Sequence, residues 1–219
     1  ARGSTGATSE SSTPSRRPAF NVDYYEDAGG AVFVTDAQLT IANTSIHNNV
    51  SFFGAGINAR GTSSVTATDC QITDNRAMLV GGGINVSYGA TIDATGCVIS
   101  GNKAFVGLEG GGVRLFNAEA TLTNCQITGN SGGFGGGVYA DGSSLTVSGG
   151  TINGNAVKTV ADSYGYYDGG AGGGVYAYNS SVAISGGAIS GNTAEGATDE
   201  YGEQIGGQGG GVYYESNYP

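Results

Sequence analysis

The sequence predicts an all-β fold: a right-handed parallel β-helix (solenoid) of about six and a half coils, with three short strands per coil. Its composition favours strands and turns, since the 219 residues include 43 glycines and no tryptophan, and only 12 % are charged. One segment also repeats: GGGVYADGSSLTVSGGTINGN at 135–155 returns with conservative changes as GGGVYAYNSSVAISGGAISGN at 172–192. Finally, apolar residues recur at fixed offsets, which is typical of a repeat architecture.

The first strand of each coil is expected at the apolar residue that follows a glycine cluster. These anchors are Val32, Ile57, Ile84, Val113, Val138, Val175 and Val212. The second strand follows seven or eight residues later, as in LTI from Leu39, VTA from Val65 and LTV from Leu145. The third strand is expected 14 or 15 residues after the anchor, at Ile46, Ile72, Ile99, Ile127, Ile152 and Ile189. Three strands per coil follow from these offsets.

A unit with one thin apolar row per strand cannot bury that row alone, so the coils are expected to stack. Alternation within a strand points Val138, Leu145 and Ile152 inward, and it points Tyr139 and Thr146 outward. Parallel crossovers are nearly always right-handed, which sets the expected hand. The solenoid domain is predicted to cover residues 29–219.

Two interior ladders are predicted from residues that keep one offset in each coil. The pattern I-x-x-N places an asparagine at one corner, where stacked amides hydrogen-bond to one another. Three cysteines precede the ladder isoleucines by two residues and are expected to be buried free thiols, because in-register neighbours are too far apart for an unstrained disulfide. The ladder residues are Asn49, Asn75, Asn102, Asn130, Asn155 and Asn192, with Cys70, Cys97 and Cys125.

The short motifs resemble those of right-handed parallel β-helix repeat proteins of the polymorphic outer-membrane protein and autotransporter passenger type. The GGA(I/V/L) motif of that family appears as GGAV at 29–32 and, in shifted form, as GGGV or GGGI. Its FxxN motif appears as ITDN, ISGN, ITGN and INGN, with Ile in place of Phe. The resemblance covers about residues 29 to 215 and implies the fold. It does not choose among adhesins, glycan-processing enzymes and fibres, all of which are built on such coils.

The charge balance excludes one class of partner. A net charge of -10 and a pI near 4.2 argue against nucleic-acid binding, which needs a basic face. No window of about 18 apolar residues occurs, so no membrane span is expected. No charged-then-apolar leader precedes Ala1, so no retained signal peptide is expected.

Catalysis is not expected. His47 is the only histidine, and it lies beside a ladder turn. A polysaccharide hydrolase would need paired carboxylates on one face, whereas the acidic residues nearest to this arrangement fall at unmatched offsets. Those residues are Asp69, Asp74, Asp93, Glu109 and Glu119. We expect no metal site in the coils and no cofactor.

Two long loops, 156–171 and 193–208, follow the ladder asparagine in the 37-residue repeats. Loops of this length usually bind something, so a tyrosine-rich, acidic recognition surface for sugar or protein is one interpretation, and a solvated acidic bulge is the other. The candidate surface comprises Tyr139, Asp162, Tyr164, Tyr176, Asp199, Tyr201 and Tyr213. Calcium is an alternative ligand there, through Asp162, Asp168, Asp199 and Glu200.

Four Asn-x-Ser/Thr sequons are candidate N-glycosylation sites: Asn43, Asn49, Asn85 and Asn179. The abundance of Ser and Thr makes several such matches expected by chance. An ice-binding role would need a flat two-column Thr array, whereas Thr40, Thr66 and Thr146 with Ala183 make one broken column.

The two ends of the chain predict self-association. The last segment, GGGVYYESNYP, supplies one strand of a further coil, and the Ser/Thr/Pro-rich residues 1–28 are expected to complete that coil in a neighbouring copy. A basic N-terminal tail would meet an acidic, tyrosine-rich opposite end. The candidate contacts are Arg2, Arg16, Arg17, Tyr24, Tyr25, Tyr213 and Tyr214. The alternatives are a slice of a longer solenoid and a leader that packs on its own coils.

These observations favour an extracellular or cell-surface structural protein, a homopolymer that assembles head to tail into a filament with an adhesive outer face. Surface glycans or matrix are further candidate partners. The second hypothesis is a monomeric adhesin or glycan-binding passenger fragment, and the third is a polysaccharide-processing enzyme.

Overall fold

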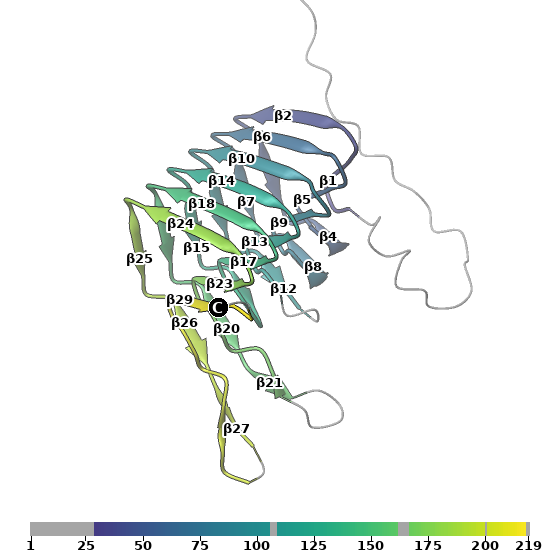
Figure 1. Cartoon of the computed structure of the whole chain (residues 1–219). Coiled ribbons are helices and arrows are strands. Elements are labelled where there is room, and N and C mark those ends of the chain that lie inside the picture. The colour runs from purple at the N-terminus through teal and green to yellow at the C-terminus, as the bar shows by residue number, and fades with distance from the viewer. Residues whose placement is uncertain (1–28, 106–108, 162–166, 200, 218–219) are drawn as a thin grey trace, which may run out of the picture.

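The computed structural model describes residues 29–105, 109–161, 167–199 and 201–217, and these residues form a parallel β-solenoid without any helix (Figure 1). Residues 1–28 lie outside the described part of the chain. The all-β prediction and the stacked coils are confirmed, as are the three predicted strands of each coil. The coils bury a continuous row of aliphatic side chains along the axis, from Val34 and Ile46 at one end to Val175 near the other.

Three parallel sheets correspond to the three predicted strands of each coil, and we name them sheets A, B and C. Sheet A comprises β1 (Val32–Thr35), β5 (Ile57–Arg60), β9 (Ile84–Ser87), β13 (Val113–Phe116), β17 (Val138–Asp141), β23 (Val175–Tyr178) and β29 (Val212–Glu215). Sheet B comprises β2 (Gln38–Ala42), β6 (Ser64–Thr68), β10 (Thr91–Thr95), β14 (Glu119–Thr123), β18 (Ser144–Ser148) and β24 (Ser181–Ser185). Sheet C comprises β3 (Ser45–His47), β7 (Gln71–Thr73), β11 (Val98–Ser100), β15 (Gln126–Thr128), β19 (Thr151–Asn153) and β25 (Ala188–Ser190).

A fourth parallel sheet, sheet D, follows the ladder asparagine in every coil, and it was not expected from the sequence. It comprises β4 (Val50–Phe53), β8 (Arg76–Val80), β12 (Lys103–Ala104), β16 (Ser131–Gly132), β20 (Ala156–Lys158) and β26 (Thr193–Glu195). Its inward column consists mostly of small residues, such as Ala77, Ala104 and Gly132. Small residues give no apolar signal, so the strands of this sheet could not be recognised from hydrophobic periodicity.

The register is in phase along the whole stack. Ile84 lies opposite Ile57 on one side and Val113 on the other, and the remaining anchors continue the same column. The strands therefore keep one set of side chains inside in every coil, as the alternation predicts.

Glycine is required where neighbouring coils approach most closely. A Cβ added at Gly112 would lie 2.5 Å from the carbonyl oxygen of Gly137 in the next coil and 3.0 Å from Nδ2 of Asn130. Gly110, two residues earlier, turns the chain with φ 64°. The glycine clusters thus bring the start of sheet A into contact with the asparagine corner.

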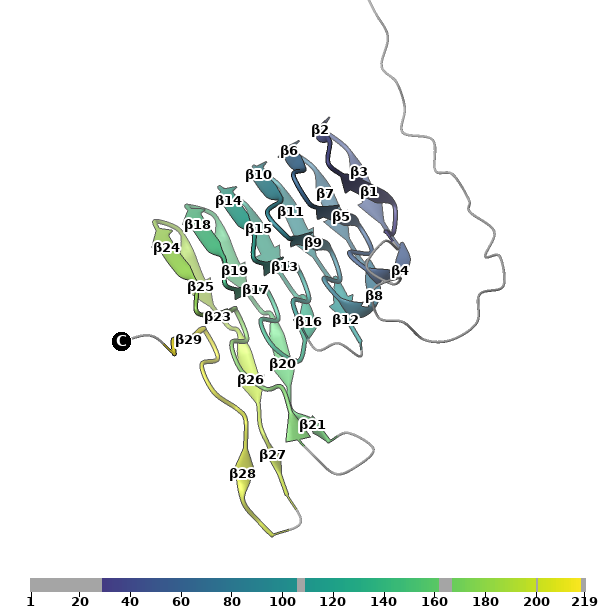
Figure 2. The ribbon, with the colours of Figure 1, turned by 45° about the vertical axis from the view of Figure 1, so that its right-hand side comes forward.

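The two long loops contain antiparallel hairpins that project from the stacked coils (Figure 2). In both, the first three residues extend sheet D, and the hairpin follows. The first hairpin pairs β21 (Val160–Ala161) with β22 (Tyr167–Asp168), and the second pairs β27 (Ala197–Thr198) with β28 (Gln204–Ile205). Both hairpins therefore leave the molecule on the side of sheet D.

Candidate functional site

The six ladder asparagines form one column at the corner between sheets C and D, and the inner four are fully buried. Asn102 donates from Nδ2 to Oδ1 of Asn130 in the next coil (3.0 Å) and to the carbonyl oxygen of Ile72 in the preceding coil (2.8 Å). Its own Oδ1 accepts from the backbone N–H and from Nδ2 of Asn75, both at 3.0 Å. Each inner asparagine uses its whole hydrogen-bonding capacity to join three coils, which is a structural role.

Cys70, Cys97 and Cys125 are buried in successive coils as free thiols. The Sγ of Cys97 lies 3.5 Å from the carbonyl oxygen of Ala67, to which it donates. Burial raises the pKa of the Cys70 thiol, and the adjacent Cys125 thiol together with burial raises the pKa of Cys97. Neutral, enclosed thiols of this kind fill space and are poor nucleophiles.

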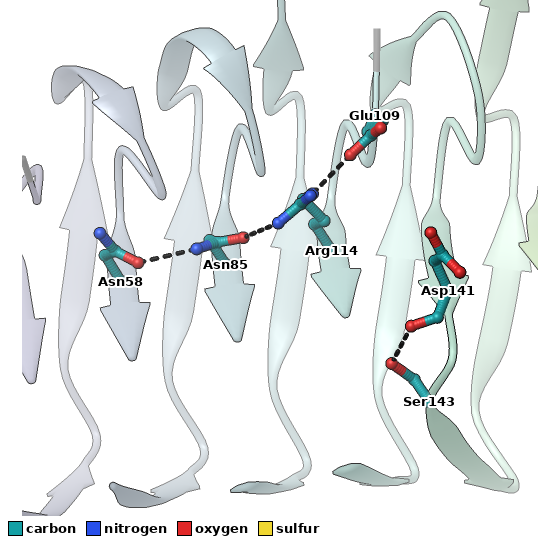
Figure 3. A network of polar contacts seen from close by, with 6 residues as sticks. All are labelled: Asn58, Asn85, Glu109, Arg114, Asp141 and Ser143. Atoms are coloured by element: carbon teal, nitrogen blue, oxygen red, sulfur yellow. Dashed lines mark hydrogen bonds and ion pairs between the residues drawn. The ribbon is translucent and has the colours of Figure 1, made fainter. Parts of the chain in front are cut away.

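The outer face of sheet A carries a polar network on its second, third and fourth strands, which was not predicted from the sequence (Figure 3). Nδ2 of Asn85 donates to Oδ1 of Asn58 (2.8 Å), and Nη1 of Arg114 donates to Oδ1 of Asn85 (3.1 Å). Nε of Arg114 contacts Oε2 of Glu109 at 2.7 Å, which completes a chain of contacts across three neighbouring strands and the turn before β13. All three strand residues occupy the second position of their strand. That shared offset is the only feature of the sequence from which this network could have been predicted.

The same column continues as a stack of tyrosines. The Tyr139 and Tyr176 rings are 5.3 Å apart between centroids and nearly parallel, at 2°, and Tyr213 stacks on Tyr176 at 5.3 Å and 15°. Phe134, whose ring lies 5.1 Å from that of Tyr176, belongs to a turn that runs along this face. Tyr139 is consequently only 7 % exposed. This corrects its assignment to a recognition surface, because the protein itself covers nearly all of the side chain.

Burial changes the ionisation of this stack. It raises the pKa of Tyr176 to about 12, and it raises the pKa of Tyr139 further. Tyr176 and Tyr213 are partly exposed. Burial also raises the pKa of Asp141, which ends the strand that carries Tyr139, although Arg114 acts in the opposite direction.

The four sequons differ in accessibility. Asn85 is buried and its Nδ2 donates to Asn58, so it cannot carry a glycan on the folded chain, which corrects its assignment. Asn49 is half-buried, and its Nδ2 donates to Asn75 within the ladder at 2.8 Å. Asn43 is exposed and Asn179 is half-buried. Only these last two leave Nδ2 without a protein partner among the described residues.

The acidic loops are described in part. Asp162, Tyr164 and Glu200 lie outside the described residues, as does the side chain of Asp168. Tyr201 is 83 % exposed at the end of the second hairpin, and Asp199 lies beside it. Across the described ranges no group of three or more His, Cys, Asp or Glu side chains is placed to hold a metal ion, so the calcium interpretation gains no support from these residues.

The outer face of sheet D combines apolar and basic side chains. Val50, Phe52, Met78 and Phe105 are each at least 39 % exposed there. Arg76, Lys103 and Lys158 lie on the same face, which contains three of the five cationic side chains within the described residues.

A groove of about 420 Å³ crosses this face of sheet D. Lys103 and Phe105 form one wall, and Lys158 with Glu195 forms the other, joined by an ion pair of 3.3 Å. The groove exists because the intervening coil contributes only Ser131, Gly132 and Gly133.

The candidate subunit contacts are also described in part. Arg2, Arg16, Arg17, Tyr24 and Tyr25 lie outside the described residues. Tyr214 occupies an inward position in the last strand, opposite Ala177, and is 57 % exposed because no described coil covers it. Tyr213 lies on the outward side of the same strand, in the tyrosine stack.

The parallel coils, the asparagine corner and the glycine turns define a β-solenoid repeat protein. A family model described as the right-handed beta helix region matches residues 15–155, which is more than half of the chain, and the chain belongs to this family. No curated protein and no solved structure matches the chain. Within the described residues no helix is long and apolar enough to cross a membrane.

Proposed function

We propose that this chain is an extracellular structural subunit that stacks head to tail with further copies into a surface filament with an adhesive outer face. This use of the fold corresponds to the surface-protein repeats that the motifs resemble. The observation that carries the proposal is the pair of end faces of the solenoid that the described residues leave uncovered.

Each end face is a sheet edge above an incompletely covered core. Strands β24, β25 and β29 pair on one side only among the described residues, and Ile184, Val212 and Tyr214 are exposed there. At the opposite end, Leu39 and Ile41 of β2 are only half-buried. Unpaired strand edges with apolar neighbours are templates for pairing with another chain.

The asparagine ladder makes the two end faces chemically different from each other. Within the described part of the chain, Oδ1 of Asn49 accepts no hydrogen bond, and the backbone N–H of Asn192 donates none. One end therefore presents an acceptor and the other a donor, which supports stacking of copies that point the same way. Such a contact does not close, so it produces a filament.

Strand β29 begins a coil for which sheets B, C and D have no strand among the described residues. We assign residues 1–28 of a neighbouring copy to that coil, and deletion of these residues is expected to abolish filaments.

A pair of edge variants tests the proposal. Ile189→Lys places a charge on the inward side of β25 at the end face, whereas Ser190→Lys places the same charge on the outward side of the same strand. Negative-stain microscopy is expected to show long filaments for the parent chain and for Ser190→Lys, and single short rods for Ile189→Lys. Short rods for the parent chain would refute filament formation.

A monomeric adhesin is the second candidate function, and the groove on sheet D favours it. The ring of Phe105 and the ammonium groups of Lys103 and Lys158 line a hollow that a glycan could enter. Binding on a glycan array by a chain that stays monomeric, lost in Phe105→Ala, would support this function instead.

A further inference from the structure

We infer that the tip of the second hairpin of one copy docks on the outer face of sheet D of another copy. The tip consists of Asp199 and residues 201–203. The basic face consists of Val50, Arg76, Met78, Lys103 and Phe105, in the first three coils. This inference rests on the proposed self-association and identifies a specific contact within it.

The basic face concentrates positive charge that nothing in the described chain neutralises. Arg76 and Lys103 lie directly opposite each other in adjacent strands. Both cations lie against one aromatic ring, with Cζ of Arg76 4.6 Å and Nζ of Lys103 4.5 Å from the centroid of Phe105. Neither forms an ion pair with a carboxylate of the described residues, although like charges opposite each other are destabilising. A carboxylate docked here would relieve that repulsion.

The same face offers apolar surface next to the charges. Val50 is 66 % exposed, Met78 is 43 % exposed and Phe105 is 39 % exposed, and they come from three successive coils. Contiguous exposed apolar side chains with a polar rim are typical of an interaction site. Met and Phe favour an aromatic partner in particular.

The hairpin tip has the complementary chemistry. Oδ1 of Asp199 accepts hydrogen bonds from the backbone N–H of Tyr201 (2.9 Å) and of Glu203 (2.8 Å), and the N–H of Gly202 donates to the carbonyl oxygen of Asp199 (3.1 Å). These bonds hold the described residues of the tip together, and they leave Tyr201 83 % exposed, with Asp199 and Glu203 each two residues away in the sequence. A fixed tip loses little entropy on binding.

The positions of the two surfaces suit contact between stacked copies. The hairpins leave from the D strands of the last two coils, whereas the basic face lies on the D strands of the first three (Figures 1 and 2). Stacking copies in the same direction would bring the D strands that carry the hairpins, in the last two coils of one copy, towards the first coils of the next copy, which carry the basic face. The charges agree, because the chain from Val138 onward has eight acidic residues and one cation, Lys158.

Charge-reversal variants of the full chain test the contact. Arg76→Glu with Lys103→Glu reverses the face, and Glu203→Lys reverses the tip while keeping the Asp199 turn. Either change is expected to raise the critical concentration for assembly, measured by sedimentation, about tenfold or more. A chain that carries both changes should recover at least part of the loss. Asp93→Lys, on the exposed face of sheet B, makes the same charge change as Glu203→Lys and should have little effect.

The outcomes separate this contact from the filament proposal. A parent chain that stays monomeric overturns both. If the face variant and the tip variant each form filaments as well as the parent chain does, the hairpin contact is refuted and the filament proposal stands. A loss from the face variant without a loss from the tip variant means that another partner occupies the face, and it also overturns the contact. Recovery in the combined variant, together with weaker assembly at high salt, supports it.

Discussion

Replacing Asn102 by alanine should lower the free energy of unfolding by about 3–9 kcal/mol, through the three groups that it leaves unpaired in the core. The backbone N–H and one Nδ2 hydrogen of Asn75 lose their only acceptor, and the carbonyl oxygen of Ile72 loses a donor. Both asparagines are completely buried, so water cannot replace these partners without entering the stack. Each unsatisfied buried group costs about 1–3 kcal/mol, which gives the stated range.

Asn49→Ala is the matched control from the same ladder. Asn49 is half-buried and accepts nothing at Oδ1 from the described residues. Its replacement removes one side-chain hydrogen bond, while the backbone N–H of residue 49 can still donate to Asn75. The expected loss is below about 1 kcal/mol.

Equilibrium unfolding in urea, followed by circular dichroism, compares the two variants with the parent chain. Asn102→Ala should lose clearly more stability than Asn49→Ala. Equal losses would show that the ladder does not depend on satisfaction of its buried amides, and the reasoning would then be wrong.

Three further predictions concern packing, ionisation and thiol access. Gly112→Ala should lower the melting temperature strongly, because the new Cβ would lie 2.5 Å from a carbonyl oxygen. The new Cβ of Gly129→Ala would meet nothing within 4 Å, so this control should cost only about 1–2 kcal/mol for its left-handed backbone. Equal shifts of the two variants in a thermal melt would contradict this prediction. Burial raises the pKa of Tyr176 to about 12, so the stability that its neutral form contributes is complete below about pH 10 and is lost as the pH rises towards 12. Urea unfolding at several alkaline pH values should show this loss, and Tyr176→Phe should reduce it; an unchanged pH dependence would argue against the assignment. A thiol reagent should label none of the three cysteines in the native chain and all of them after unfolding. Rapid labelling of the native chain would contradict the burial of Cys70, Cys97 and Cys125.

Much of the interior could be predicted because a solenoid converts sequence offsets directly into columns. Ile72, Ile99 and Ile127 share one offset, and the structure places them opposite one another in sheet C. A shift of one residue would turn each strand inside out, so the apolar pattern fixes the register. Sheet D could not be predicted from the apolar pattern because its inward column consists mostly of small residues.

The sequence by itself determined which residues stack, since burial of the apolar rows depends only on contacts between like positions in neighbouring coils. The tertiary structure decided what happens on the outside of those coils. Tyr139 and Asn85 occupy the same outward column, and both are buried because turns and neighbouring side chains cover that face. The hairpin tip and the basic face likewise became visible only once the coils were placed in space. Outward positions carry no packing requirement of their own, so their exposure depends on how distant segments fold over them.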